Sequence, residues 1–307
     1  MNPQQPKAGQ QLSSMYNSLI MSLIQNGTQV SPHGRATREM LGVAVTVNDI
    51  RDNVIQIPER KLNYHFMVAE ALWVLMGRDD VAMLAHYNNN IAQFSDDGKT
   101  FAGAYGPRIK YQLPRIIEAL TKQPDTRQAV ISIWDRMPAP GTKDVPCTVS
   151  MQFLVRDQAL SLIVYMRSSD AWWGLPYDIF TFTSIQSALA YELKVKPGRF
   201  LLWLASSHIY ETHVEAALRM YARTGPKTWG SYLSPQLPGF PPAQLCEHEE
   251  AARLHGKFPP EKTALDPEWC DYLELLAHRK NRDDSALIGN PIGELYLQMK
   301  ERRHDKA

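Results

Sequence analysis

The chain has 307 residues, of which 44% are hydrophobic and 21% are charged, an ordinary globular composition with room for one large domain or two small ones. Its formal net charge of +1 excludes a chain-wide electrostatic case for nucleic acid or an anionic membrane as a partner. The three cysteines, Cys147, Cys246 and Cys270, are an odd and sparse set. They argue against a disulfide framework and for a reducing, cytoplasmic compartment, which would be the host cytoplasm for a viral protein. Cys246 and His248 form a short Cys-x-His without a second pair, so we expect no metal site.

The first part of the chain predicts helices and strands behind a loose tail. Residues 1–11 lack the charged start and apolar core of a signal peptide and are assigned to that tail. Apolar residues recur at helical spacing over 12–26 and over 61–77, the second helix being closed by Gly77. Residues 41–57 alternate apolar with polar side chains and predict strands. No apolar run reaches the roughly 18 residues needed to span a membrane.

The rest of the chain mixes both kinds of element. In chain order it predicts a helix at 110–122, strands at 128–134, 148–155 and 159–167, a helix at 179–193, a strand at 200–210, and helices at 211–223 and 266–279. Residues 225–262 are loop-rich, and no convincing linker divides the chain. Meandering strands mixed with helices predict one α+β domain over 1–307, of which 225–307 forms a loop-rich C-terminal part.

One cysteine stands behind a proline in a strand-like stretch, DVPCTVSMQF (144–153). A buried cysteine is usually just a small hydrophobe, so the surrounding motifs decide whether Cys147 is a nucleophile. Pro146-Cys147 is followed by Gln152-Phe153, then by RSSDAWWGLPYD (167–178) and HIYETH (208–213). Weaker matches are EALWVLMG at Glu70, GAYG at Tyr105 and PDTRQAVISIWD around Arg127.

Together these motifs resemble the thymidylate synthase family, without gaps from 146 to 213 and over roughly 15 to 220 in all. The resemblance implies a thymidylate synthase-like fold, with a mixed sheet packed with helices and forming a homodimer interface. It also implies transfer of a one-carbon unit from 5,10-methylenetetrahydrofolate to C5 of a pyrimidine nucleotide. Nucleotide and folate are then the small-molecule partners, with no nucleic acid, membrane or metal.

The resemblance assigns Cys147 and Glu70 to the chemistry. Cys147 would attack C6 of the pyrimidine, which makes C5 nucleophilic. A thiolate needs nearby positive charge, and Arg167 is the candidate that can be read from the sequence. Glu70, an acid in an otherwise apolar helix, would relay protons near the base, and burial would raise its pKa into a useful range. Tyr105 would line the site.

Basic side chains would hold the nucleotide's phosphate, because a guanidinium fork matches phosphate oxygens. By resemblance, Arg35, Arg167 and Ser168 cradle the phosphate from one subunit, and Arg127 reaches in from the other, hence a homodimer. Arg38 competes with Arg35 for this role because the local match is a few residues shorter than in the family.

The resemblance gives the remaining contacts to two further groups. His208 and Tyr210, in the His-x-Tyr-x-x-His frame, would hydrogen-bond the 3′-hydroxyl of the sugar. Asp170 and Gly174, in the Arg-Ser-x-Asp-x-x-x-Gly frame, would belong to the folate site, with Asp170 binding the pterin.

Asp178 stands where synthases carry asparagine. An asparagine amide offers one donor and one acceptor, which suits O4 and N3–H of uracil. Cytosine reverses that edge, and a carboxyl group pairs with it when one proton is shared. The cytidylate hydroxymethylases of the family resemble this chain in carrying Asp here, so Asp178 argues for a cytosine substrate.

Other departures from the synthases agree with this interpretation. Thr148 replaces the histidine after the cysteine, and Met166 replaces a glutamine. Gln128, which stands where a second arginine is usual, instead predicts a weaker phosphate site. Ile91 and Phe94 replace two tryptophans. The chain ends ERRHDKA, which is too charged to form the dry apolar lid of synthases. A wetter site that keeps the nucleophile predicts hydroxymethylation by water, with dCMP as substrate.

Four alternatives stay open from the sequence. They are a CMP hydroxymethylase of nucleoside-antibiotic biosynthesis, a dUMP hydroxymethylase, a thymidylate synthase, and a degenerate family member that only binds nucleotide or RNA. The intact Cys147, Glu70 and Asp170 speak against the last.

Overall fold

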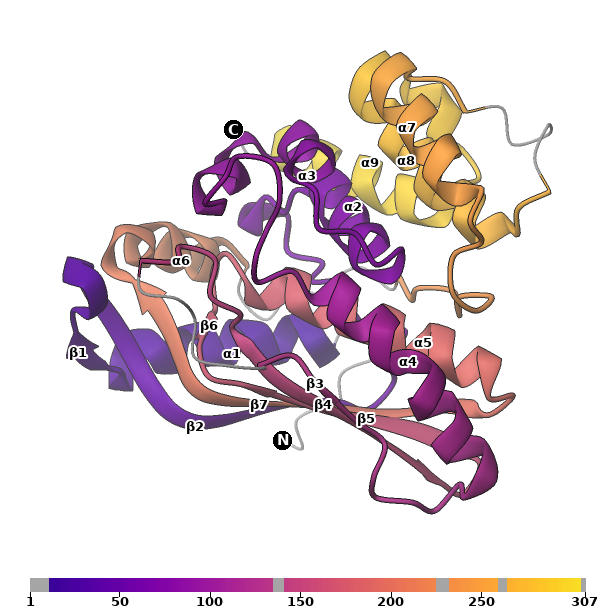
Figure 1. Ribbon diagram of the computed structural model, residues 1–307. Helices are drawn as coiled ribbons and strands as arrows, with labels where there is room; N and C mark the ends of the chain where they lie inside the picture. The colour runs from indigo at the N-terminus through magenta and orange to yellow at the C-terminus, as the bar shows by residue number, and fades with distance from the viewer. Residues whose placement is uncertain (1–10, 135–140, 225–231, 259–263, 305–307) are drawn as a thin grey trace, which may run out of the picture.

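The computed structural model describes residues 11–134, 141–224, 232–258 and 264–304. Within them, one seven-stranded sheet carries helices on one side (Figure 1). The strands are β1 (Thr28–Val30), β2 (Thr37–Val47), β3 (Val130–Ser132), β4 (Thr148–Arg156), β5 (Ala159–Met166), β6 (Ser169–Asp170) and β7 (Lys196–Tyr210). Their spatial order is β1-β2-β7-β5-β4-β3, and β6 pairs with β7. Because β7 runs parallel to β5 and β6 while the other neighbours are antiparallel, the predicted mixed sheet of an α+β fold is confirmed.

Two helices form the centre of the layer above the sheet. The described helices are α1 (Gln11–Asn26), α2 (Tyr64–Leu75), α3 (Val81–Tyr87), α4 (Tyr105–Lys122), α5 (Leu175–Glu192), α6 (Glu211–Thr224), α7 (Leu245–His255), α8 (Pro267–Asn281) and α9 (Pro291–His304). Helix α5 packs on β5 and β7, and α2 packs on α5. Burial of α5 is continuous over 179–190, and every residue of α2 is buried except Glu70. None of these helices is long and apolar enough to cross a bilayer.

The other face of the sheet is covered by none of the described helices (Figure 1). The register aligns Ser150, Tyr165, Trp203 and Ala44 across four strands in one row of that face. Tyr165 is 38% exposed and Trp203 45% exposed, although both belong to central strands. Large apolar side chains exposed on an open sheet face are typical of a protein–protein contact surface.

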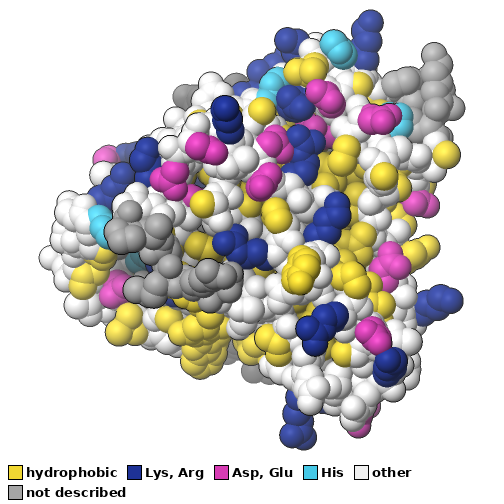
Figure 2. Space-filling model, in the orientation of Figure 1, with side chains coloured by type: hydrophobic (Ala, Val, Ile, Leu, Met, Phe, Trp, Pro, Cys, Tyr) yellow, Lys and Arg dark blue, Asp and Glu magenta, His cyan; other side chains and the backbone are white. Residues whose placement is uncertain are grey.

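Charged side chains of both signs are mixed on the face of the molecule drawn in Figure 2. On this face, Lys and Arg side chains are scattered among Asp and Glu rather than gathered into one patch. This agrees with the net charge of +1 and leaves any anion to a local cluster.

Most predicted elements are found with shifted ends. The helices predicted at 12–26, 61–77, 110–122, 179–193, 211–223 and 266–279 correspond to α1, α2, α4, α5, α6 and α8. Helix α5 begins four residues early because Pro176 occupies its first turn, where a missing N–H costs nothing. Helix α3 was not predicted, and the strand predicted at 128–134 shrinks to β3.

The prediction of strands over 41–57 was wrong beyond Val47. Residues 48–57 form bends and turns, yet Val54, Ile55 and Ile57 are buried in the core. Side chains rather than a neighbouring strand satisfy this backbone: the Gln56 N–H, for example, donates to Ser13 Oγ at 2.9 Å. The apolar pattern of this segment therefore reflects burial in the core and not hydrogen bonding to a neighbouring strand.

The C-terminal part is more helical than predicted. Helices α7 and α9 lie inside 225–307, and α8 packs against both α7 and α2. The α7 pattern is hidden because two of its buried positions are charged, Glu249 and Arg253. Helix α9 was also not predicted, although its buried residues recur at helical spacing: Ile292, Leu295 and Met299. The predicted tail 1–11 lies outside the described residues except for Gln11, as do 225–231, 259–263 and 305–307.

Glu249 fastens this C-terminal part to the first half of the chain. Its fully buried carboxylate accepts hydrogen bonds from Arg253 Nε at 3.0 Å and Tyr87 OH at 3.2 Å, and it lies 3.9 Å from Arg78 Nη1. Glu249→Ala is expected to lower the free energy of unfolding by about 3 kcal/mol, because it leaves a buried guanidinium unpaired. Urea denaturation measures this, with the exposed Glu250→Ala as control. Equal midpoints for the two variants would contradict the role.

Candidate active site

Arg167, the residue directly after β5, holds the loop that contains Cys147. The β4–β5 hairpin turns through Asp157 and Gln158, both at positive φ (51° and 57°), as a tight two-residue hairpin turn requires. Thr148 therefore faces Met166, and the Arg167 N–H donates to the Cys147 carbonyl at 2.9 Å.

The Arg167 side chain binds the same loop. Its Nε donates to the Pro146 carbonyl at 2.9 Å, and its Nη2 donates to the Val145 carbonyl at 3.1 Å. The same Nη2 lies 4.0 Å from Cys147 Sγ. Burial raises the pKa of the Cys147 thiol to about 11, and the Arg167 charge opposes that rise only in part. The thiol is therefore protonated at neutral pH, and a proton must leave it before attack.

Two carboxyl groups lie on α2 and α5, two helices that pack against each other. Glu70 and Asp178 are the acids of α2 and of the first turn of α5, and both remain partly open within otherwise buried stretches. Phe66 and Tyr177 pack edge to face between these helices, with ring centroids 5.4 Å apart. The Asn63 N–H donates to Tyr177 OH at 3.2 Å, which fixes the same contact.

Burial raises the pKa of both carboxyl groups. That of Glu70 rises to about 8, with a further contribution from the negative charge of Asp178. That of Asp178 rises to about 7, with a further contribution from Asp170. Both groups therefore titrate near neutral pH, which suits them to accept and donate protons.

Tyr105 joins the nucleophile loop to the start of α4. Its hydroxyl oxygen accepts a hydrogen bond from the Thr148 N–H at 3.3 Å. Burial raises the pKa of Tyr105, and the charges of Cys147 and Asp178 raise it further, so all three lie near one another.

Asp144 forms a second tie between the same two segments, and the sequence did not single it out. Its Oδ2 accepts a hydrogen bond from the Gly103 N–H at 2.6 Å. A Cβ at Gly103 would stand 2.7 Å from the Asp144 carbonyl oxygen, so only glycine permits this approach. The only sequence signal was an acid three residues before the cysteine.

Asp144→Asn is expected to speed alkylation of Cys147 several-fold near pH 8. The Asp144 charge is one of the causes that raise the thiol pKa, after burial and Asp178. Asn removes that charge but can still accept from Gly103, so the thiol pKa falls while the loop stays tied. The pH profile of iodoacetamide alkylation measures this. Asp144→Ala, which also loses the tie, is the control, and an unchanged Asn profile would contradict the electrostatic role.

Asp170 lies between the carboxyl pair and β7. Its Oδ1 accepts hydrogen bonds from the backbone N–H groups of Trp172 at 2.8 Å and Trp173 at 3.1 Å. A Cβ at Gly174 would stand 3.3 Å from the Asp170 carbonyl oxygen and 3.4 Å from Asp178 Oδ2. Gly174 therefore lies in close contact with the Asp170 backbone and the Asp178 carboxyl group. Strand β6 aligns Asp170 with His208 of β7.

His208 and Tyr210 lie together at the end of β7, with ring centroids 5.4 Å apart. Burial lowers the pKa of His208, against the opposing charges of Asp170 and Glu39, and favours the neutral imidazole. The Arg35 guanidinium lies 5.8 Å from the centre of the Tyr210 ring. The predicted sugar-binding pair and one candidate phosphate ligand therefore share one end of the sheet.

Arg38, the competitor of Arg35, is already engaged. It pairs with Glu211, with 2.7 Å between Nε and Oε1, and donates to the Ile24 carbonyl. Arg35 is exposed, and its guanidinium forms no ion pair within the described part of the chain. Arg35 is thus the more available of the two cations.

The two other predicted phosphate ligands, Ser168 and Arg127, differ in burial. Ser168 is partly buried directly after Arg167, where β5 gives way to β6. Arg127 is exposed near the β3 edge, and its carbonyl accepts a hydrogen bond from Gln152 Nε2 at 2.9 Å. Among the described residues its guanidinium contacts none of the other predicted site residues. No group of three or more potential metal-ligating side chains occurs in the described ranges.

Comparison with known proteins agrees with this arrangement. Residues 14–231 match the family model of thymidylate synthase. The chain is similar to a deoxyuridylate hydroxymethyltransferase of Bacillus phage SP01, with 32% identity over 222 residues that cover 66% of this chain and 58% of the relative. It is also similar to a deoxyuridylate hydroxymethyltransferase of Pseudomonas phage M6, with 36% identity over 169 residues that cover 52% and 48%. The chain thus spans about half the length of the curated relatives it matches. Because the family model matches well over half of the chain, the chain belongs to the thymidylate synthase family.

Proposed function

We propose that the chain is a pyrimidine-nucleotide 5-hydroxymethylase and that its substrate is dCMP. Hydroxymethyl transfer is supported by the names of the two phage relatives. The cytosine base is supported by one observation: a carboxyl group with a pKa near 7, Asp178, in the site that contains Cys147 and Glu70. The co-substrates would be 5,10-methylenetetrahydrofolate and water.

Asp178 would recognise the base by sharing a proton with it. Protonated, its carboxyl group donates to N3 of cytosine while its other oxygen accepts from the N4 amino group. A pKa of about 7 means that either form is accessible at neutral pH, so this pairing costs little. Uracil would pair with the ionised carboxylate only through N3–H and would leave O4 facing the second carboxylate oxygen, acceptor against acceptor, which a buried site tolerates poorly.

Cys147 and Glu70 would perform the remaining steps of the reaction. Cys147 loses its proton and adds to C6, and the electron density moves to C5. The folate supplies the one-carbon unit at C5 and leaves as tetrahydrofolate. Glu70, with a pKa of about 8, exchanges protons at the base and with the incoming water. When Cys147 departs from C6, the 5-hydroxymethyl nucleotide is released.

The phosphate would bind between two subunits. Arg35, Arg167 and Ser168 would contribute from one subunit and Arg127 from its partner. The open sheet face with Tyr165 and Trp203 supports this proposal, because two such faces together bury apolar surface.

Subunit mixing tests this arrangement. Arg127→Ala and Cys147→Ala are each expected to be nearly inactive. Mixed after mild dissociation, they should regain about a quarter of wild-type activity, because half of the dimers are then mixed and each mixed dimer has one intact site. Steady-state turnover of the mixture measures this. Lys99→Ala mixed with Cys147→Ala is the control, and no recovery above the separate variants would contradict a shared site.

The direct test of function is turnover on dCMP, CMP and dUMP side by side, with product masses. We expect 5-hydroxymethyl-dCMP and tetrahydrofolate from dCMP, with CMP as the comparison for sugar preference. Dihydrofolate and a methylated base would instead identify a synthase. Binding without turnover would identify a degenerate member.

The second candidate is hydroxymethylation of dUMP. The printed names of both phage relatives favour it. Preference for dUMP in the same assay would establish it and remove the role proposed for Asp178.

A further inference from the structure

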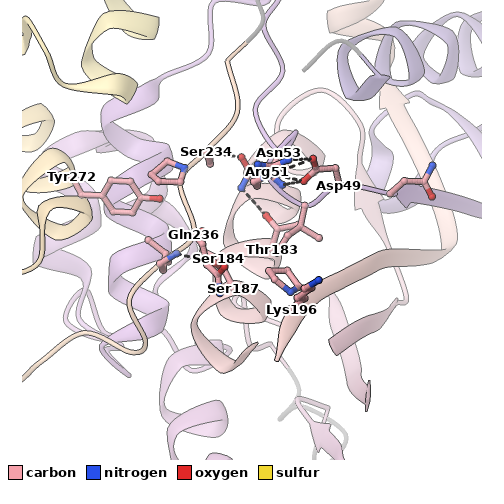
Figure 3. A pocket seen from close by; sticks show the side chains of 15 residues that line it. Asp49, Arg51, Asn53, Thr183, Ser184, Ser187, Lys196, Ser234, Gln236 and Tyr272 are labelled. Carbon is pink, nitrogen blue, oxygen red and sulfur yellow. Dashed lines mark hydrogen bonds and ion pairs between the residues drawn. The ribbon is translucent and has the colours of Figure 1, made fainter. Parts of the chain in front are cut away.

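A second pocket lies apart from Cys147, and none of the predicted site residues lines it. It has a volume of about 460 Å³ and lies between the segment after β2, the second half of α5, the start of β7 and residues 234–237 (Figure 3). Thr183 is the lining residue of α5 nearest to Asp178, and it stands five residues after it, roughly 7.5 Å along the helix. The two sites are therefore separate.

The inner wall of the pocket is already formed. Asn53 Nδ2 donates to Thr183 Oγ1 at 3.0 Å, and Ser234 Oγ donates to Asn53 Oδ1 at 2.6 Å. The Leu237 N–H donates to Ser187 Oγ at 2.9 Å, so Ser187 keeps its own proton for another partner. A wall whose members bind one another needs little ordering when a ligand enters.

The mouth of the pocket is rich in unused donors. The side chains of Lys196, Asn48 and Gln236 have no hydrogen bond or ion pair to a described residue. Arg51 binds Asp49 through Nε and Nη2, and no described residue accepts from its Nη1. Asp49 is the only acid in the lining and is neutralised by that pair, so Lys196 leaves an excess of one positive charge. Unpaired donors with positive charge fit an oxyanion.

The remaining surface is apolar. Tyr272 reaches the pocket from the side opposite Asp49 and Arg51 in Figure 3, and Pro197 and Pro235 complete the walls. Such walls suit a flat ring or a sugar rather than a bare ion. We propose that this pocket binds a small phosphorylated molecule of nucleotide size, with its phosphate at Lys196 and Arg51 and its body against Pro197 and Pro235.

Hydrogen–deuterium exchange of the full chain tests the proposal, with dCTP, cytidine and inorganic phosphate as separate probes. We expect dCTP to protect segments 48–53 and 234–237, with weaker protection by phosphate and none by cytidine. Lys196→Ala should weaken the protection by dCTP at least tenfold. Lys99→Ala, an exposed lysine elsewhere, should not change it. Lys196 is exposed and lines no core, so its loss spares folding.

Each other outcome overturns the proposal. Absence of protection in these segments with every probe rules out the site. Protection that Lys196→Ala leaves unchanged rules out the phosphate contact, and equal protection by inorganic phosphate and dCTP rules out recognition of the body. Protection around Cys147 and His208 is read separately in the same experiment, so failure of this site does not depend on the proposed function.

Discussion

Asp178→Asn is expected to move substrate preference from dCMP, the proposed substrate, toward dUMP. The substitution keeps the size of the side chain and replaces a shared proton with a fixed donor and acceptor. The amide N–H₂ then faces O4 of uracil and its carbonyl faces N3–H, whereas cytosine meets donor against donor. We expect the ratio of kcat/KM for dCMP to that for dUMP to fall at least about 100-fold, since unpaired buried polar groups discriminate strongly.

The measurement is kcat/KM for each nucleotide at saturating folate. Asp178→Ala is the control, because it removes the recognition of both bases and should lower both values without reversing the preference. A fall in both values without a change in their ratio for Asp178→Asn would mean that the group acts only on proton transfer or on folding. The pH dependence of wild type adds a check, because dCMP turnover should decline above the Asp178 pKa of about 7.

The part of the site that lies on one hairpin could be predicted from the sequence. Alternation over 148–155 and 159–167 and the turn between them place Cys147 beside Arg167, and the backbone bond between them follows from the register. The anomalous acid Glu70 was also visible, because a charged residue in an apolar helix needs a reason. The position of Glu70 near Asp178 depends on the packing of α2 on α5.

Contacts between distant segments could not be predicted in this way. The choice between Arg35 and Arg38 depends on Glu211, which lies 173 residues after Arg38 and binds it. The tie from Asp144 to Gly103 spans 41 residues and leaves no local pattern. The sequence shows which chemical groups are present, whereas tertiary structure decides which of them are free.

The C-terminal part was misread for a related reason. Hydrophobic periodicity assumes that charged residues face water. In α7 the inner face includes Glu249 and Arg253, which are buried because they pair with each other and with Tyr87. A helix that buries an ion pair lacks a continuous apolar stripe. The loop-rich composition around α7 was therefore the stronger signal in the sequence.

Glu70→Gln is expected to abolish most turnover and at the same time stabilise the ligand-free protein at alkaline pH. Glu70 is protonated in the fold up to about pH 8, against an ordinary value of 4.5. The folded state therefore binds more protons than the unfolded state between these limits. The contribution of Glu70 to stability is full below about pH 4.5 and is lost as the pH rises through about 8.

Gln cannot ionise, so this loss should disappear in the variant. We expect the free energy of unfolding to fall less steeply between pH 5 and 9 than in wild type, with a gap on the order of a few kcal/mol at the alkaline end. Asp178 keeps its own slope, which ends near pH 7. Turnover should fall roughly 10²- to 10⁴-fold because the proton relay is lost.

Urea denaturation across this pH range and steady-state kinetics measure the two effects together. Glu250→Gln, an exposed acid on α7, is the control and should change neither. Parallel stability curves for Glu70→Gln and wild type would contradict the raised pKa, and retained turnover would remove Glu70 from the chemistry. A stability gain coupled to lost activity would mean that the partly buried Glu70 carboxyl group destabilises the ligand-free protein. The same burial raises its pKa, which suits the group to accept and donate protons near neutral pH.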